Sequence, residues 1–133
     1  MKIESCSFPG DFQIWTYDVS HGRLLLRRPK AGGPTRVDVL FTDVHFIQIC
    51  AFFDSLSVET IKDISSLGLP ISICKATADS TLKTFKIQSA DWTGYVVAGA
   101  MHVHEDEEDF ARPSKIFKPG PLMRSLAAAG YSP

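Results

Sequence analysis

The sequence predicts an α+β fold that is mainly antiparallel β, with about seven strands in a sandwich or partly open barrel and one or two short helices. Three observations lead to this prediction. Many segments are rich in aromatic and β-branched residues, their polarity often alternates with period two, and the links between them are short and contain turn residues. A chain of 133 residues is close to the commonest domain size, so we expect a single domain, residues 1–133.

The first fifty residues are expected to form four strands in an antiparallel meander. Residues 12–19 are rich in aromatic and β-branched side chains, and a tight turn leads from them into a returning strand at 23–28. A loop with glycine and proline at 29–34 interrupts the ladder. Two further strands are predicted at 36–41 and 44–49, and links this short favour neighbouring antiparallel strands.

Residues 36–41 have the clearest strand pattern in the chain. Val37 and Val39 point to one side of an extended chain, and Arg36 and Asp38 point to the other. This alternation predicts a sheet with one buried face and one solvated face.

Residues 54–68 have a pattern that suits two kinds of element. Apolar residues recur every three positions, at Val58, Ile61, Ile64 and Leu67. This spacing favours a short helix that ends at Gly68, ahead of Pro70. The alternative is a strand at 56–61, because valine, threonine and isoleucine also favour strands.

The second half of the chain is expected to add three strands and a short helix. Residues 71–77 and 82–89 read as a strand pair, and 95–104 as the longest strand of the protein. The last of these is apolar on both faces at its start, which indicates a central position in the sheet. Residues 122–129 suit two helical turns.

Composition and charge exclude several classes of function. Hydrophobic residues make up 44% and charged residues 22%, so a folded domain is expected. The net charge of -1 supplies no overall field for nucleic acid or an anionic membrane, and we regard nucleic acid as an unlikely partner. No apolar run suits a signal peptide or a membrane helix, and the three cysteines contain no C-x-x-C pair. A cytoplasmic protein with reduced thiols is expected.

His102 and His104 are the first candidate site. Residues two apart in a strand point the same way, so both imidazoles should leave one face together, with Glu108 close behind. Two imidazoles and a carboxylate can hold one divalent transition metal. The string from Gly99 to Glu108 resembles the first metal motif of the cupins, in which H-x-H is followed after three or four residues by glutamate.

The cupin resemblance implies a small β-barrel enzyme that depends on a metal held by His102, His104 and Glu108. The sequence departs from the cupin pattern in two ways. Val96 stands where the motif has glycine, and no histidine follows His104, so a third imidazole would have to come from upstream. The metal-dependent enzyme is therefore the alternative hypothesis. The main hypothesis, a non-catalytic protein-binding module, requires no cofactor.

The acidic run that follows is the second candidate site, and it supports the main hypothesis. Five consecutive acids should form a solvated loop, because their charges would repel one another in a ladder. Four of them are the candidate binding residues, Glu105, Asp106, Glu107 and Asp109. A concentrated negative charge can steer a basic partner protein, so we expect a non-catalytic protein-binding module with an accessory or immunity-type role.

Residues 20–27 (S-H-G-R-L-L-L-R), together with 36–41 (R-V-D-V-L-F), carry a second resemblance. This pattern is similar to one found in small bacterial proteins of unassigned function. The resemblance covers the first fifty residues and implies a bacterial single-domain protein. It supplies no catalytic residue.

Overall fold

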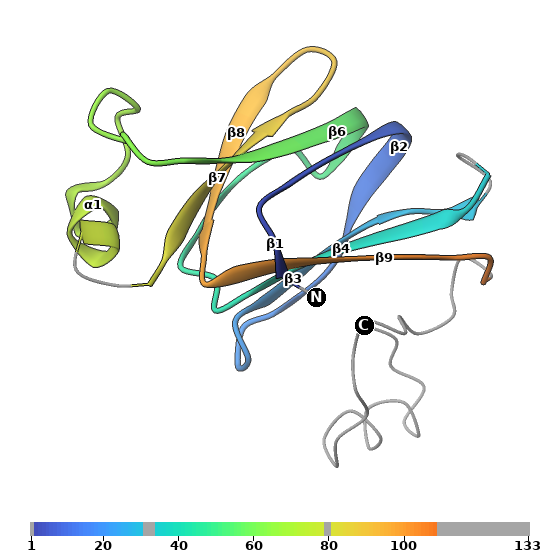
Figure 1. Ribbon diagram of the computed structural model, residues 1–133, viewed down its shortest axis with the longest axis horizontal. Coiled ribbons are helices and arrows are strands. Elements are labelled where there is room, and N and C mark those ends of the chain that lie inside the picture. The colour runs from blue at the N-terminus through green and yellow to red at the C-terminus, as the bar shows by residue number, and fades with distance from the viewer. Residues whose placement is uncertain (1, 31–33, 79–80, 109–133) are drawn as a thin grey trace.

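The computed structural model describes residues 2–30, 34–78 and 81–108, which form one curled antiparallel sheet and one short helix (Figure 1). The elements, in chain order, are β1 (Lys2–Ile3), β2 (Ser5–Asp18), β3 (Arg23–Arg28), β4 (Arg36–Thr42), β5 (Phe46–Gln48), β6 (Phe52–Ile61), α1 (Ile71–Ala78), β7 (Lys83–Gln88), β8 (Thr93–Ala98) and β9 (Ala100–Asp106). The predicted fold class, mainly antiparallel β with a short helix, is confirmed.

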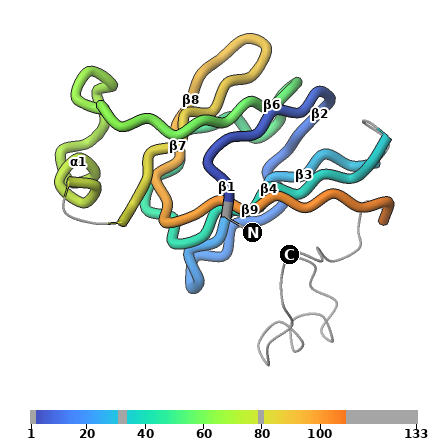
Figure 2. The backbone as a smooth tube through the Cα atoms, in the orientation of Figure 1, coloured from blue at the N-terminus to red at the C-terminus, as the bar shows by residue number. Residues whose placement is uncertain are grey.

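The nine strands pair in the order β1-β9-β4-β3-β2-β6-β7-β8-β5, and every pair is antiparallel. The sheet curls, and β8 continues into β9 through Gly99 alone although the two strands pair with different neighbours (Figure 2). β4 pairs with β9 from Arg36↔Asp106 onward, and β5 then pairs with β8. The single long strand predicted at 95–104 is thus two strands that join distant parts of the sheet.

The core lies inside this curl, and its fully buried side chains come from every strand except the short edge strands β1 and β5, whose Ile3 and Ile47 pack against it. Fourteen buried side chains form one cluster: Phe12, Leu24, Leu26, Val37, Val39, Phe41, Phe53, Leu56, Val58, Phe85, Ile87, Val96, Ala98 and Met101. Aromatic rings contact one another across it, with Phe41 and Phe85 edge to face at 5.2 Å between centroids. The inward positions alternate along β3 and β4, as the period-two pattern predicted.

Two sequence-based assignments in the middle of the chain are wrong. The predicted helix at 54–68 is wrong and the alternative, a strand at 56–61, is confirmed: these residues belong to β6, since Leu56 and Val58 alternate into the core while the backbone pairs with β2 and β7. The predicted strand at 71–77 is helix α1, whose first turn begins with hydrogen bonds from the Ile73 and Cys74 amides to the Pro70 carbonyl. The predicted helix at 122–129 lies outside the described residues. No helix in the described part of the chain is long and apolar enough to cross a membrane.

Candidate functional site

His102 and His104 lie on the same face of β9, as their spacing predicted. They stand opposite Leu40 and Asp38 of β4, respectively. His104 Nε2 lies 3.5 Å from Asp106 Oδ2. Among residues 2–30, 34–78 and 81–108, no three His, Cys, Asp or Glu side chains converge in a way that could hold a metal ion.

The start of the acidic run lies in a strand and not in the solvated loop that the sequence predicted. β9 extends through Glu105 and Asp106, so both residues belong to the sheet. Glu105 accepts a hydrogen bond from the Thr35 hydroxyl (3.0 Å), and the backbone amide of Glu108 donates to Asp106 (3.0 Å). Glu107 is exposed. Asp109 lies outside the described residues.

Asp106 is held in the sheet by Arg36, its register partner on β4. Arg36 donates two parallel hydrogen bonds to the Asp106 carboxylate, from Nε (2.9 Å) and Nη2 (2.8 Å). Burial on its own would raise the pKa of Asp106. The hydrogen bonds from Arg36 and from the Glu108 amide outweigh it, so the pKa is lowered. The opposite charge of Arg36 on the neighbouring strand explains why Asp106 can be part of the β-sheet.

A second buried ion pair lies beside the first, on the face expected to be solvated. Arg27 donates to Asp38 from Nε (2.7 Å) and Nη2 (3.3 Å), and the two side chains are 0% and 1% exposed. The Trp15 ring packs on the Arg27 guanidinium, 4.6 Å from its centroid. The expectation of a wet face around Arg36 and Asp38 is therefore wrong: the charges are neutralised in pairs and buried.

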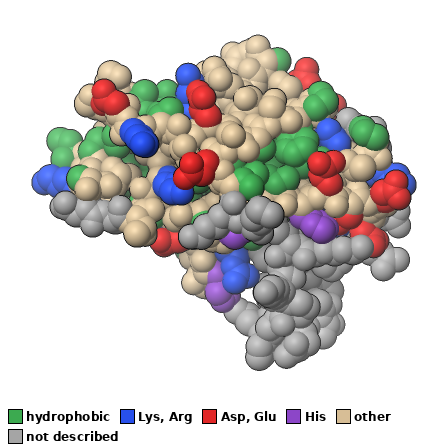
Figure 3. Space-filling model, in the orientation of Figure 1, with side chains coloured by type: hydrophobic (Ala, Val, Ile, Leu, Met, Phe, Trp, Pro, Cys, Tyr) green, Lys and Arg blue, Asp and Glu red, His purple; other side chains and the backbone are tan. Residues whose placement is uncertain are grey.

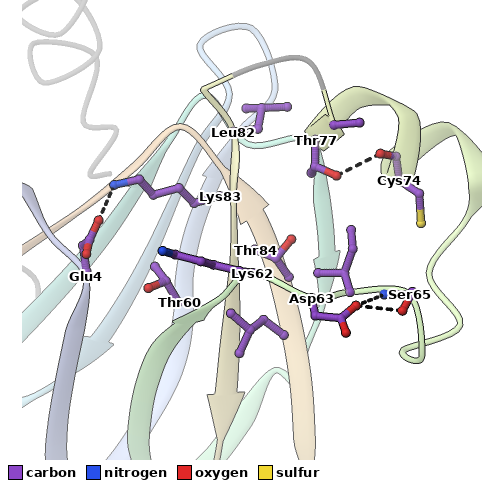
Figure 4. A pocket seen from close by; sticks show the side chains of 13 residues that line it. Glu4, Thr60, Lys62, Asp63, Ser65, Cys74, Thr77, Leu82, Lys83 and Thr84 are labelled. Carbon is purple, nitrogen blue, oxygen red and sulfur yellow. Dashed lines mark hydrogen bonds and ion pairs between the residues drawn. The ribbon is translucent and has the colours of Figure 1, made fainter.

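A groove lies elsewhere, between β6, α1 and β7 (Figure 4). This groove has a volume of about 590 Å³, within the range usual for ligand sites. It forms where β6 ends and the chain crosses residues 62–70 to reach α1. Its lining residues are Glu4, Thr60, Ile61, Lys62, Asp63, Ile64, Ser65, Cys74, Thr77, Ala78, Leu82, Lys83 and Thr84.

The groove combines an apolar surface with charges of both signs. Ile61, Ile64 and Leu82 supply the larger apolar side chains. Lys83 Nζ contacts Glu4 Oε1 at 2.7 Å, and this hydrogen bond and the lysine charge lower the pKa of Glu4. Acidic and basic side chains also lie side by side, without a block of one sign, on the face of the molecule in Figure 3.

Asp63 is satisfied from within its own loop. Its Oδ1 accepts hydrogen bonds from the Ser65 hydroxyl (2.7 Å) and the Ser65 amide (3.1 Å), which lower the Asp63 pKa. Such an Asx turn holds the loop at the mouth of the groove. On the helix side, the Thr77 hydroxyl donates toward the backbone carbonyls of Ile73 and Cys74.

Sequence reasoning missed both the groove and the buried ion pairs. The groove brings together Glu4, Lys62 and Lys83, and only the pairing of strands shows that these distant positions meet. Assigning residues 54–68 to a helix also misplaced Lys62. The signal for the ion pairs was present as arginines and acids on adjacent strands, but pairing them requires the register.

Comparisons with protein-family models, with curated proteins and with solved structures found no match to this chain.

Proposed function

We propose that this protein is a non-catalytic binding module that recognises a segment of another protein in the groove between β6, α1 and β7. The observation that carries the proposal is the combination of an open groove with apolar side chains and a polar rim. A peptide segment offers matching chemistry, since its side chains can bury against Ile61, Ile64 and Leu82 while its polar groups meet the rim. A volume of about 590 Å³ accommodates several side chains.

The chemistry of the groove favours binding over catalysis. None of its described lining residues is a histidine, the side chain that most often acts as a general base. Cys74 is in the groove, and its thiol lies 3.8 Å from the Leu69 carbonyl. Elsewhere, burial raises the pKa of the Cys6 thiol to about 11, so this thiol is far from a reactive thiolate at neutral pH.

The cysteines support the cytoplasmic part of the proposal. Cys6, Cys50 and Cys74 are all unpaired. Free thiols suit a reducing compartment, in which an accessory or immunity-type module would meet its partner. The role itself stays a proposal, as does the acidic docking surface, of whose described members Glu105 and Glu107 are exposed.

Site-specific photo-crosslinking tests the proposal. A photoreactive amino acid replaces Ile64 or Thr77 in the groove, and Val19, which is 76% exposed outside it, serves as the control position. In cells of the source organism, the two groove positions should crosslink to the same protein, and Val19 should not. Purified partner should then bind Ile64→Glu at least about tenfold more weakly than wild type, the effect of losing about 1.4 kcal/mol.

Two results would contradict the proposed function. One is equal crosslinking from Val19 and from the groove. The other is unchanged affinity of the purified partner for Ile64→Glu.

A further inference from the structure

The strands β3 and β4 are buried on both of their faces. One face carries side chains of the core cluster. The opposite face, which we call the outer face, includes Leu25 and Arg27 of β3 and, opposite them, Leu40 and Asp38 of β4. It continues onto β9, where His102 stands opposite Leu40. Leu25 and Leu40 are 0% and 4% exposed, although neither belongs to the core cluster.

A strand with water on one face has a different pattern, which β6 illustrates. There Leu56 and Val58 are buried, Ser57 between them is partly exposed and Glu59 is exposed. Strands that are buried on both faces are covered by a layer on each side. No described strand or helix forms the second layer over β3 and β4, because all strands belong to the one sheet and α1 lies at its other end, beside β6 and β7 (Figure 1).

The cover belongs to the same chain, since the outer face is buried within a single molecule. Outside the described residues the chain has residue 1 and the segments 31–33, 79–80 and 109–133. Residues 31–33 join the ends of β3 and β4, and Leu25 lies roughly 10 Å along β3 from that end, too far for so short a link to reach and return. Residues 79–80 follow α1. Only 109–133 is long enough.

The path of the chain also leads to this face. The last described strand, β9, is the neighbour of β4, and its Asp106 is paired with Arg36 on the outer face. The segment 109–133 follows two residues later. It therefore starts at the border of the surface that needs a cover.

The composition of residues 109–133 suits the outer face. Leu122 and Leu126 are one turn apart in the helix predicted at 122–129, so they share one side of it. That apolar side can bury against Leu25 and Leu40. After Asp109 the segment has no acid, and it is basic through Arg112, Lys115, Lys118 and Arg124. These charges complement the acidic side chains at the end of β9.

We propose that residues 109–133 bind back onto the outer face of β3, β4 and β9 and cover Leu25 and Leu40 with apolar side chains. This second layer accounts for the burial of β3 and β4 on both faces. His102 then lies within an internal interface of the chain. The inference is independent of the proposed protein-binding function, which concerns the groove between β6, α1 and β7 at the other end of the sheet.

The test is paramagnetic broadening in the full chain. A ketone-bearing amino acid replaces Ser125 and is coupled to a nitroxide, which leaves the native cysteines unlabelled. In the amide NMR spectrum, Leu25, Leu40 and His102, which form one row across three strands, should lose most of their signal. A nitroxide at Ile71, which is 74% exposed on α1, is the control and should leave this row unchanged.

Two substitutions in the chain labelled at position 125 test the apolar contact. Leu126→Glu would bring a charge against the two leucines, where water could not solvate it, so the signals of the row should return. Ser132→Glu adds the same charge outside the helix predicted at 122–129 and should leave the broadening unchanged.

Full signal in the row, or broadening that persists in Leu126→Glu, would overturn the inference. Broadening at Ile61 and Thr77 in place of the row would put the segment in the groove and would contradict the proposed function as well. Loss of signal that is as strong when the nitroxide and the isotope label are on different molecules would assign the cover to a second copy of the chain.

Discussion

Arg27 and Asp38 show how single residues shape this protein. Both side chains are almost fully buried, and the two hydrogen bonds between them fix the guanidinium against the carboxylate. Burying either charge alone would cost several kcal/mol, because water no longer solvates it. The pair therefore helps to specify how β3 and β4 align, because only the register that places Arg27 of β3 opposite Asp38 of β4 neutralises both buried charges.

This pair gives a prediction about the free energy of unfolding. Asp38→Ala leaves Arg27 buried without its counter-charge and should lower the free energy of unfolding by about 3–5 kcal/mol. Urea unfolding followed by Trp fluorescence measures the loss. The double variant Arg27→Met/Asp38→Leu removes both charges and should be clearly more stable than Asp38→Ala. A single variant that is as stable as wild type would show that the pair is not buried in solution.

At the scale of elements, the sequence identified strands best where their two faces differ in chemistry. β3 and β4 were placed within a residue or two, since their inward positions are aliphatic or aromatic and their ends carry arginine or a polar residue. The order of β2, β3 and β4 followed from the short links between them. The number of strands was underestimated because β8 and β9 read as one strand, β6 was assigned to a helix and β1 was not predicted, while 71–77 was wrongly counted as a strand.

β6 and α1 were misassigned because local pattern and tertiary pairing disagree there. In β6 the residues Leu56 and Val58 follow period two, but Val58 and Ile61 also fit the three-residue spacing of Ile64 in the loop beyond. Residues 71–77 are rich in strand formers, yet α1 has no fully buried residue and lies beside the sheet, so no strand partner competes with helix formation. The information that decides both cases is in distant residues.

For the candidate site, sequence spacing predicted which side chains share a face within one strand. It did not predict which side chains from different strands lie close together. His102 and His104 do share a face of β9. Thr60 and Thr84 line the same groove because β6 pairs with β7, which sequence spacing across the intervening loop and helix does not reveal.

Gly94 gives a prediction at this scale, since β5 is attached to the sheet only through β8. A Cβ atom at Gly94 would clash with the backbone carbonyl oxygen of Gln48 in β5 and would also crowd the Trp92 ring. Gly94→Ala should therefore lower the free energy of unfolding by about 1–3 kcal/mol and weaken hydrogen-exchange protection in β5. Thr93→Ala, at an exposed neighbouring position, should change stability by no more than about 0.5 kcal/mol. If Gly94→Ala behaves like this control, β5 does not pack on β8 as closely as described.

At the scale of the whole molecule, the curl of the sheet depends on contacts between parts of the chain that are far apart in sequence. β9 joins β4 to β1, and the Arg36–Asp106 ion pair spans 70 residues. Such pairings close large loops, and their interactions must offset the entropy of loop closure. A charged pair at this junction makes the stability of the whole sheet depend on pH.

The dependence has a definite sign. The folded pKa of Asp106 is lowered, whereas in the unfolded chain the group has its ordinary pKa of about 3.9. The stabilisation is therefore fully present above about pH 5 and is lost as the pH falls through the lowered folded pKa. Asp106→Asn should cost about 3 kcal/mol at pH 7, since Arg36 stays buried without a full counter-charge. The difference from wild type should shrink steadily from pH 5 to pH 2.

Urea unfolding at a series of pH values measures this profile. Glu107→Gln, an exposed position in the same acidic run, is the matched control and should follow the wild-type curve. Glu4, Asp18 and Asp63 also have lowered pKa values, so wild type and control should both lose some further stability in acid. The contribution of Asp106 is measured by the difference in free energy of unfolding between wild type and Asp106→Asn, which should decrease as the pH falls. A gap that stays constant down to pH 2 would mean that the carboxylate contributes nothing to the junction of β4 and β9 beyond its shape.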